Sequence, residues 1–292
     1  MRSRATSSVL VVILGLTSVI IGGPVFALLF IWVGVAGYAE YLGLVARINS
    51  NFRRSCALVG FGSIVALGLV ALIDATTESL FAVSALTVAV PLTLLLIHPT
   101  REGAFSAWAL VSAGSLYLGL PVFAAVAVRS IPGPTDSDWL TDLSAIVSIG
   151  WESSPRGLAW ALLVILATWI SDTAAYLIGG TWGKRKFAPK ISPNKTVEGA
   201  AGGLIVSICV CALTFQISGL GTWWLGSIFG GVLGLAGQVG DLAESFLKRQ
   251  AGVKDSGTLL PGHGGILDRI DALLFTFPAG FVIASGFERI AS

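Results

Sequence analysis

Charged and small polar side chains interrupt apolar sequence at several places in the second half of the chain, and one group of them has a helical spacing. Steps of three, three, one and three residues place its members on one face of a helix. They are Gln238, Asp241, Glu244, Ser245 and Lys248. Two acids on one helix face predict a site for a hard cation, which prefers carboxylate oxygens. The structural alternative is a salt bridge between Glu244 and Lys248.

A glycine-rich loop with charged residues on both sides holds the second group of candidates. Three glycines surround His263, among them Gly264 and Gly265, so backbone N–H groups of this turn can approach a ligand. Asp268 and Asp271 follow, three residues apart on one face of the next predicted helix. The other charged candidates of this region are Arg249, Lys254, Asp255 and Arg269.

Two further places attract attention. Asp172 lies well inside an apolar run, where a carboxylate costs roughly 2.5–3.5 kcal/mol on insertion scales, so it has either a function or a structural hydrogen bond between helices. Further along, small hydroxyls beside a lysine at the start of a helix suit a phosphate, because donors, a point cation and a helix N-terminus converge. This segment is Ser192-Pro193-Asn194-Lys195-Thr196-Val197-Glu198-Gly199.

The composition indicates which elements must carry these residues. Of 292 residues, 54% are apolar and only 12% are charged, about half the charged fraction of a typical soluble domain. The chain is therefore predicted to be a polytopic membrane protein of the all-α class. This excludes an ordinary soluble enzyme, a disordered chain and a disulfide-stapled secreted domain. The net charge of +2 argues against nucleic acid as a partner.

Apolar runs of roughly 20 residues, the length that crosses a bilayer, predict nine transmembrane helices. Their ranges are 8–22, 24–46, 56–73, 79–97, 103–128, 157–179, 199–219, 222–241 and 272–289. The segment 130–156 is predicted to be an external loop with a surface helix near Trp139. The chain then divides into an N-terminal transmembrane region, 1–156, and a C-terminal catalytic region, 157–292.

The loops predict the orientation of these spans. With a cytoplasmic N-terminus, fifteen Lys and Arg residues fall in inner segments and three in outer ones, as the positive-inside rule requires. The charged candidates then lie at the cytoplasmic face. The lack of a targeting extension leads us to expect a multi-pass protein of a prokaryotic plasma membrane.

Carboxylates for a divalent metal, cations for phosphate oxygens and glycine turns together suit phosphoryl or nucleotidyl transfer onto a lipid. A hydrolase triad does not fit, since His263 has no Gly-x-Ser-x-Gly partner. Zinc does not fit either, because His98 and His263 are the only histidines and neither has a cysteine nearby. The four-residue repeat of Gly226, Gly230 and Gly234 is interpreted as close helix packing and not as a phosphate loop.

One long run of these residues resembles a known signature. Ser245-Phe246-Leu247-Lys248-Arg249, then Lys254-Asp255, then the run from Pro261 to Asp271 is similar to the signature of the phosphatidate cytidylyltransferase (CDP-diacylglycerol synthase) family. Segments 192–199 and 238–245 resemble two further blocks of that family, and the resemblance is sharp over about 169–271. Asn194 and Val197 stand where a second lysine and an aromatic residue are expected, which puts in doubt a role for those two positions only.

The resemblance implies that CTP and phosphatidic acid react at the bilayer to give CDP-diacylglycerol and pyrophosphate, with magnesium and, as an option, a second cation. Catalytic roles are implied for Asp172, Asp241, Lys248, His263 and Asp268, with Asp241 and Asp268 as the metal ligands. Substrate contacts are implied for Ser192, Lys195, Thr196, Glu198, Gln238, Glu244, Ser245, Arg249, Lys254, Asp255, Gly264, Gly265, Arg269 and Asp271. Glycine-rich spans also favour a homodimer.

Three other functions remain open from the sequence. A secondary transporter would use Glu40, Asp172 and Asp241 as an ion path, and it predicts inverted repeats, of which the chain shows no sign. A related cytidylyltransferase would act on another lipid phosphate, such as an ether-lipid or polyprenyl acceptor. A non-catalytic lipid-binding scaffold is the third, and the unbroken set of acidic and basic positions argues against it.

Overall fold

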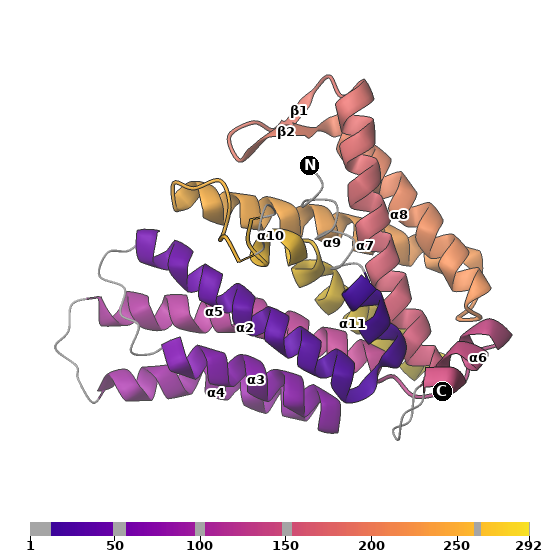
Figure 1. The fold of residues 1–292 in the computed structure, drawn as a ribbon, viewed down its shortest axis with the longest axis horizontal. Helices are drawn as coiled ribbons and strands as arrows, with labels where there is room; N and C mark the ends of the chain where they lie inside the picture. Colours follow the sequence, from indigo (N-terminus) through magenta and orange to yellow (C-terminus); the bar gives the residue numbers. More distant parts are fainter. Residues whose placement is uncertain (1–12, 49–56, 97–102, 148–153, 260–263, 292) are drawn as a thin grey trace. The chain divides into compact units, whose positions relative to one another are not determined.

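Helices make up most of the chain in the computed structural model, which describes residues 13–48, 57–96, 103–147, 154–259 and 264–291 (Figure 1). The all-α class predicted from composition is confirmed. The elements are α2 (Gly23–Ile48), α3 (Ala57–Ile73), α4 (Thr77–Leu96), α5 (Ala104–Arg129), α6 (Asp138–Val147), α7 (Pro155–Trp182), β1 (Lys186–Ala188), β2 (Ser192–Thr196), α8 (Val197–Ile217), α9 (Trp223–Gln250), α10 (Leu267–Ile270) and α11 (Leu273–Ala291). Helices suit such apolar sequence, because each satisfies its own backbone polar groups without water.

Seven segments within the described residues are long and apolar enough to cross a bilayer: α2, α4, α5, α7, α8, α9 and the stretch from Leu267 to Ile290. The span predicted over 56–73 corresponds to α3, which is apolar but only 17 residues long. The first predicted span, 8–22, begins outside the described residues. The chain is therefore a multi-pass membrane protein by its helices, while the total of nine spans and the cytoplasmic N-terminus stay predictions. The surface helix expected near Trp139 is present as α6.

The chain folds into two compact units, each assembled from separate stretches of sequence. The first unit comprises Met1–Gly15, Pro24–Ala127 and Leu247–Ile270, and so holds α2 to α5, the last turn of α9 and α10. The second unit comprises Leu16–Gly23, Val128–Phe246 and Asp271–Ser292, and so holds α6 to α8, most of α9 and α11. The candidate residues of the sequence analysis are divided between the two units.

Close approach of helices builds the core of the first unit. Tyr38 of α2 is completely buried, and a methyl group at Gly60 of α3 would overlap its hydroxyl. Ile64 and Leu67 of α3 and Leu118 of α5 are also fully buried. A small residue at 60 therefore lets two apolar helices pack closely enough to enclose a large aromatic side chain.

The second unit confirms that the repeated glycines serve helix packing. On α9, a Cβ at Gly230 would lie 2.6 Å from backbone atoms of Ser207 and Ile208 on α8, and the Ser207 hydroxyl donates to the Gly230 carbonyl at 2.8 Å. On α8, a Cβ at Gly203 would lie 2.9 Å from the Ala175 Cβ of α7. Such spacing leaves no room for a side chain, so these glycines are explained without a ligand.

The segment between the predicted spans 157–179 and 199–219, to which the sequence analysis assigned no strand, has regular structure. It contains a two-stranded antiparallel hairpin, in which Lys186 pairs with Thr196 and Ala188 with Ser192 (Figure 1). Strand pairing satisfies backbone groups that a short polar segment would otherwise leave to water. Thr196 then ends β2 and caps α8, because its hydroxyl accepts a hydrogen bond from the Gly199 N–H at 3.1 Å.

Gly230→Leu is expected to destabilise the protein, whereas Gly231→Leu on the same helix should not. The side chain at 230 must displace the backbone of α8, at a cost of about 1–3 kcal/mol in the free energy of unfolding. At 231 the new Cβ meets nothing within 4 Å. Thermal unfolding in detergent should therefore give a lower midpoint for Gly230→Leu alone, and equal midpoints would contradict the packing role.

Candidate active site

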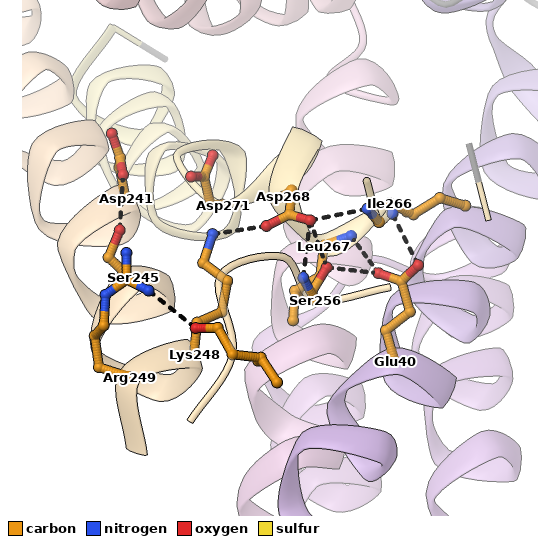
Figure 2. A network of polar contacts seen from close by, with 12 residues as sticks. Glu40, Asp241, Ser245, Lys248, Arg249, Ser256, Ile266, Leu267, Asp268 and Asp271 are labelled. Atoms are coloured by element: carbon orange, nitrogen blue, oxygen red, sulfur yellow. Dashed lines mark hydrogen bonds and ion pairs between the residues drawn. The ribbon is translucent and has the colours of Figure 1, made fainter. Parts of the chain in front are cut away.

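A lysine–aspartate pair lies at the centre of the polar residues of the first unit. The Lys248 Nζ and the Asp268 Oδ1 are 2.6 Å apart, and each side chain is only 11% exposed (Figure 2). The other carboxylate oxygen of Asp268, Oδ2, accepts hydrogen bonds from the Ser256 N–H at 2.9 Å, the Ser256 hydroxyl at 3.0 Å and the Gly265 N–H at 2.8 Å. Four donors thus hold one carboxylate in its charged form.

The glycines of the signature loop make this arrangement possible. Gly264 has a φ of +80°, a backbone conformation that other residues rarely adopt, and a Cβ there would lie 2.9 Å from the Asp268 Oδ2. A Cβ at Gly265 would overlap the Ser256 hydroxyl and the carboxylate of Glu40. The sequence predicted that backbone N–H groups of this turn approach a ligand. In the structure the Gly265 N–H donates to the carboxylate of Asp268, and the approach to a ligand stays a prediction.

Glu40 is a functional candidate that the sequence analysis used only in the transporter alternative. It projects from α2, and its carboxylate accepts hydrogen bonds from the N–H groups of Ile266 at 3.0 Å and Leu267 at 2.9 Å (Figure 2). It also accepts from the Ser256 hydroxyl at 2.9 Å. Since α10 begins at Leu267, Glu40 caps its N-terminus. One signal was visible in the sequence, because Glu40 is the only acid among residues 1–73.

A second lysine–aspartate pair lies in the second unit. The Lys195 Nζ and the Asp241 Oδ2 are 2.6 Å apart, with side chains 26% and 33% exposed. Ser245, one helical turn further along α9, is 3.5 Å from the Asp241 Oδ1. Asp172 of α7 interacts electrostatically with both Asp241 and Lys195. The structure therefore brings together residues of three predicted segments, 169–176, 192–199 and 238–245.

Glu198 and Gln238 form hydrogen bonds with the backbone around this second pair. The Glu198 carboxylate accepts hydrogen bonds from the backbone N–H groups of Lys184 at 3.0 Å and Arg185 at 3.2 Å, which fixes the start of the hairpin. The Gln238 amide donates to the Ala200 carbonyl at 2.8 Å and so joins α9 to α8. In this structure both side chains position the backbone that carries the lysine–aspartate pair.

The remaining predicted residues have varied surroundings. Glu244 and Ser245 are buried on α9, and Lys248, for which a bond to Glu244 was the structural alternative, reaches Asp268. Arg249 donates to the Val253 carbonyl at 2.9 Å, and Asp271 accepts from the Ala272 N–H at 2.7 Å. The exposed residues are Lys254, Asp255 and Arg269. His263 lies outside the described residues.

The carboxylates fit magnesium in chemistry, though not as a closed protein cage. Carboxylate oxygens are the ligands that Mg²⁺ prefers, and this ion commonly takes one or two of them together with water and substrate phosphates. Within the described residues, no three Asp, Glu, His or Cys side chains gather as a metal site. Asp241 and Asp268 each contact a lysine that could pass to a phosphate. These residues therefore fit an ion that arrives with a phosphate substrate.

Comparison with known proteins adds a family. A model described as "Cytidylyltransferase family" matches residues 2–287. The phosphatidate cytidylyltransferases of Staphylococcus saprophyticus and Staphylococcus aureus are each 48% identical to the chain over 140 residues, which is 46% of this chain and 54% of the relative. That of Staphylococcus epidermidis is 47% identical over 139 residues, with the same coverage. The matched region thus spans about half the length of these curated relatives.

Glu40→Gln is expected to loosen the signature loop, because the amide keeps only one acceptor oxygen and places its NH2 group against one of the two backbone N–H donors. Leaving such buried groups unsatisfied costs about 1–3 kcal/mol each. Hydrogen exchange followed by mass spectrometry should be faster over 254–259 and 264–270. Glu78→Gln, at an exposed acid of α4, is the matched control. Unchanged protection in Glu40→Gln would show that the loop is held without this carboxylate.

Proposed function

The chain belongs to the cytidylyltransferase family, and from that premise we propose that it transfers the cytidylyl group of CTP to phosphatidic acid. The products are CDP-diacylglycerol and pyrophosphate. The observation that carries the proposal is the partly buried Lys248–Asp268 pair, formed within the segment that resembles the signature of phosphatidate cytidylyltransferases. The names of the staphylococcal relatives support the same activity.

The reaction needs little from the protein beyond positioning and charge neutralisation. An oxygen of the lipid phosphate attacks the α-phosphorus of CTP, a new P–O bond forms, and the bond to the bridging oxygen breaks to release pyrophosphate. A phosphate monoester has a second pKa of about 6 and is largely dianionic near neutral pH, so no protein nucleophile is required. The obstacle is repulsion between two anionic reactants, which fixed cations at the site reduce.

Two lysines are held ready for phosphate oxygens by the aspartates they contact. Asp241 and Asp268 are the proposed magnesium ligands, and Mg²⁺ supplies charge neutralisation on the phosphate oxygens when it is bound. With Mg²⁺ on these aspartates, Lys195 and Lys248 would be available to phosphate oxygens of the substrates. Each lysine then still has one anionic partner, because a phosphate oxygen replaces the carboxylate. Arg249, Lys254 and Arg269 are proposed to bind the phosphates and the leaving pyrophosphate.

The remaining proposals follow the sequence analysis. The site faces the cytoplasm of a plasma membrane, where CTP is available, and the acyl chains of the acceptor stay in lipid. Asp172 orients the pair formed by Lys195 and Asp241. A homodimer is proposed from the glycine-rich spans. The transporter alternative loses support from Glu40, since the hydrogen bonds of its carboxylate to a serine and two backbone N–H groups give it a local role.

Asp268→Asn should reduce magnesium-dependent formation of CDP-diacylglycerol by about 100-fold or more, since both the metal ligand and the partner of Lys248 are lost. The assay uses purified protein, radiolabelled CTP and phosphatidic acid in mixed micelles. Asp74→Asn, at an exposed acid between α3 and α4, is the control and should keep wild-type activity. Full activity in Asp268→Asn would remove the metal assignment. Lack of any product from the wild-type protein would contradict the proposed function.

Lys195→Gln should raise the KM for a phosphate substrate or lower kcat, in total by about tenfold or more, because a charge-assisted contact contributes about 1.5–3 kcal/mol. Lys190→Gln is the matched control, because Lys190 is an exposed lysine in the turn of the same hairpin, whereas Lys195 of β2 contacts Asp241. Initial rates with each substrate varied in turn measure both constants. Equal losses in the two variants would indicate a general effect of hairpin charge.

A further inference from the structure

The first unit contains a groove beside α2 that begins at the signature residues 254–256 and extends well beyond them. Its volume is about 1020 Å³, and it is lined by one face of α2, by Phe61 of α3 and by residues 253–259. Every lining residue belongs to the first unit. The α2 positions recur at helical spacing, so the groove follows the helix over much of its length; they are Trp32, Val35, Ala36, Ala39, Gly43 and Arg47.

The two ends of the groove differ in chemistry. At one end the indole of Trp32 is 53% exposed, and the wall beyond it consists of the small residues Ala36 and Ala39. Fifteen residues along the helix, at about 1.5 Å per residue, Arg47 reaches the groove at the other end. Lys254 lies on the facing segment, and both cations are exposed. A ligand that fills the groove therefore has an apolar part and an anionic part.

Glu40, the acid of α2 in the groove, is engaged by donors other than Arg47 and Lys254. Glu40 directs both carboxylate oxygens to the Ser256 hydroxyl and to the N–H groups of Ile266 and Leu267. Asp255 is the other acid and is exposed. Ser256 both lines the groove and donates to Asp268. The polar end of the groove is thus continuous with the donors that surround the Lys248–Asp268 pair.

We propose that the groove binds the lipid acceptor, with the acyl chain along Trp32, Ala36 and Ala39 and the phosphate monoester against Arg47 and Lys254. The inference rests on the proposed function, in which only one of the two reactants has a long apolar part. The base of CTP can stack on an aromatic ring, but CTP has no long apolar chain to lie along Ala36 and Ala39. The assignment adds α2 to the substrate site and gives Arg47, otherwise explained by membrane topology, contact with the lipid head.

Binding can be tested without turnover by photolabelling. The full chain is placed in phosphatidylcholine nanodiscs with phosphatidic acid that carries a diazirine in its acyl chain, and labelled peptides are identified by mass spectrometry. Labels should concentrate on residues 32–43 and exceed those from phosphatidylcholine with the same diazirine by about tenfold. Excess CTP should not reduce them. Arg47→Gln should lower the phosphatidic acid signal toward the phosphatidylcholine level, since it removes a charge-assisted contact.

Two glycine variants test the same groove: one fills it, and the other adds the same side chain outside it. A Cβ at Gly43 meets nothing within 4 Å, so Gly43→Leu should fold and fill the groove between Ala39 and Arg47, where the acyl chain joins the headgroup. We expect a KM for phosphatidic acid about tenfold higher, an unchanged KM for CTP and weaker photolabelling. Gly62→Leu is matched to it, because Gly62 lies on α3 of the same unit, also meets nothing within 4 Å and is absent from the groove lining.

The outcomes separate this inference from the proposed function. Labels that map elsewhere in the wild-type protein, or equal labelling by both lipids, overturn the groove as the acceptor site. An unchanged KM for phosphatidic acid in Gly43→Leu also overturns it. If the wild-type protein forms no CDP-diacylglycerol but shows the expected labelling, the proposed function fails and the groove stands as a site for a lipid phosphate.

Discussion

The polar residues of the first unit are arranged around one partly buried carboxylate, that of Asp268, which must keep its charge. Asp268 is stable there because Lys248, two groups of Ser256 and the Gly265 N–H all donate to it. An uncompensated buried charge would cost several kcal/mol. The positive φ of Gly264 follows from this need, since the turn must bring the Gly265 N–H to the carboxylate. Local backbone geometry is therefore set by one charge.

The lysines that neutralise these aspartates also explain how the site can bind anions. In each lysine–aspartate pair the cation is already oriented, and Lys248 is also largely buried, so less ordering remains to be done when a phosphate arrives. Charge–charge contacts are also stronger at a site with little water. This holds for the contact of a lysine with its aspartate and for its contact with a phosphate that replaces the aspartate. The reaction proposed for the chain joins two anions, and sites that keep cations paired until they are needed suit that requirement.

The sequence predicted the parts of this arrangement that depend on local pattern. Hydropathy located the apolar helices, the spacing from Gln238 to Lys248 predicted the polar face of α9, and repeated glycines predicted close packing. Glu40 was not among the predicted site residues, because its partners include backbone N–H groups more than 220 residues away, and a backbone group leaves no trace in the residue types. The hairpin at 186–196 was missed for a related reason, as polar strands of three and five residues have no apolar alternation to reveal them.

Ser256 connects the parts of the first unit that the sequence keeps apart. Its hydroxyl contacts both Glu40 and Asp268, and the residue also lines the groove beside α2. A ligand in the groove that shifts this serine therefore changes the donors available to Asp268, and a change at Asp268 alters the groove by the same coupling free energy, since linkage is reciprocal. In the proposed reaction, this couples binding of the lipid to the charge balance at the Lys248–Asp268 pair. On this proposal, an apolar helix of the bundle takes part in chemistry performed on a phosphate.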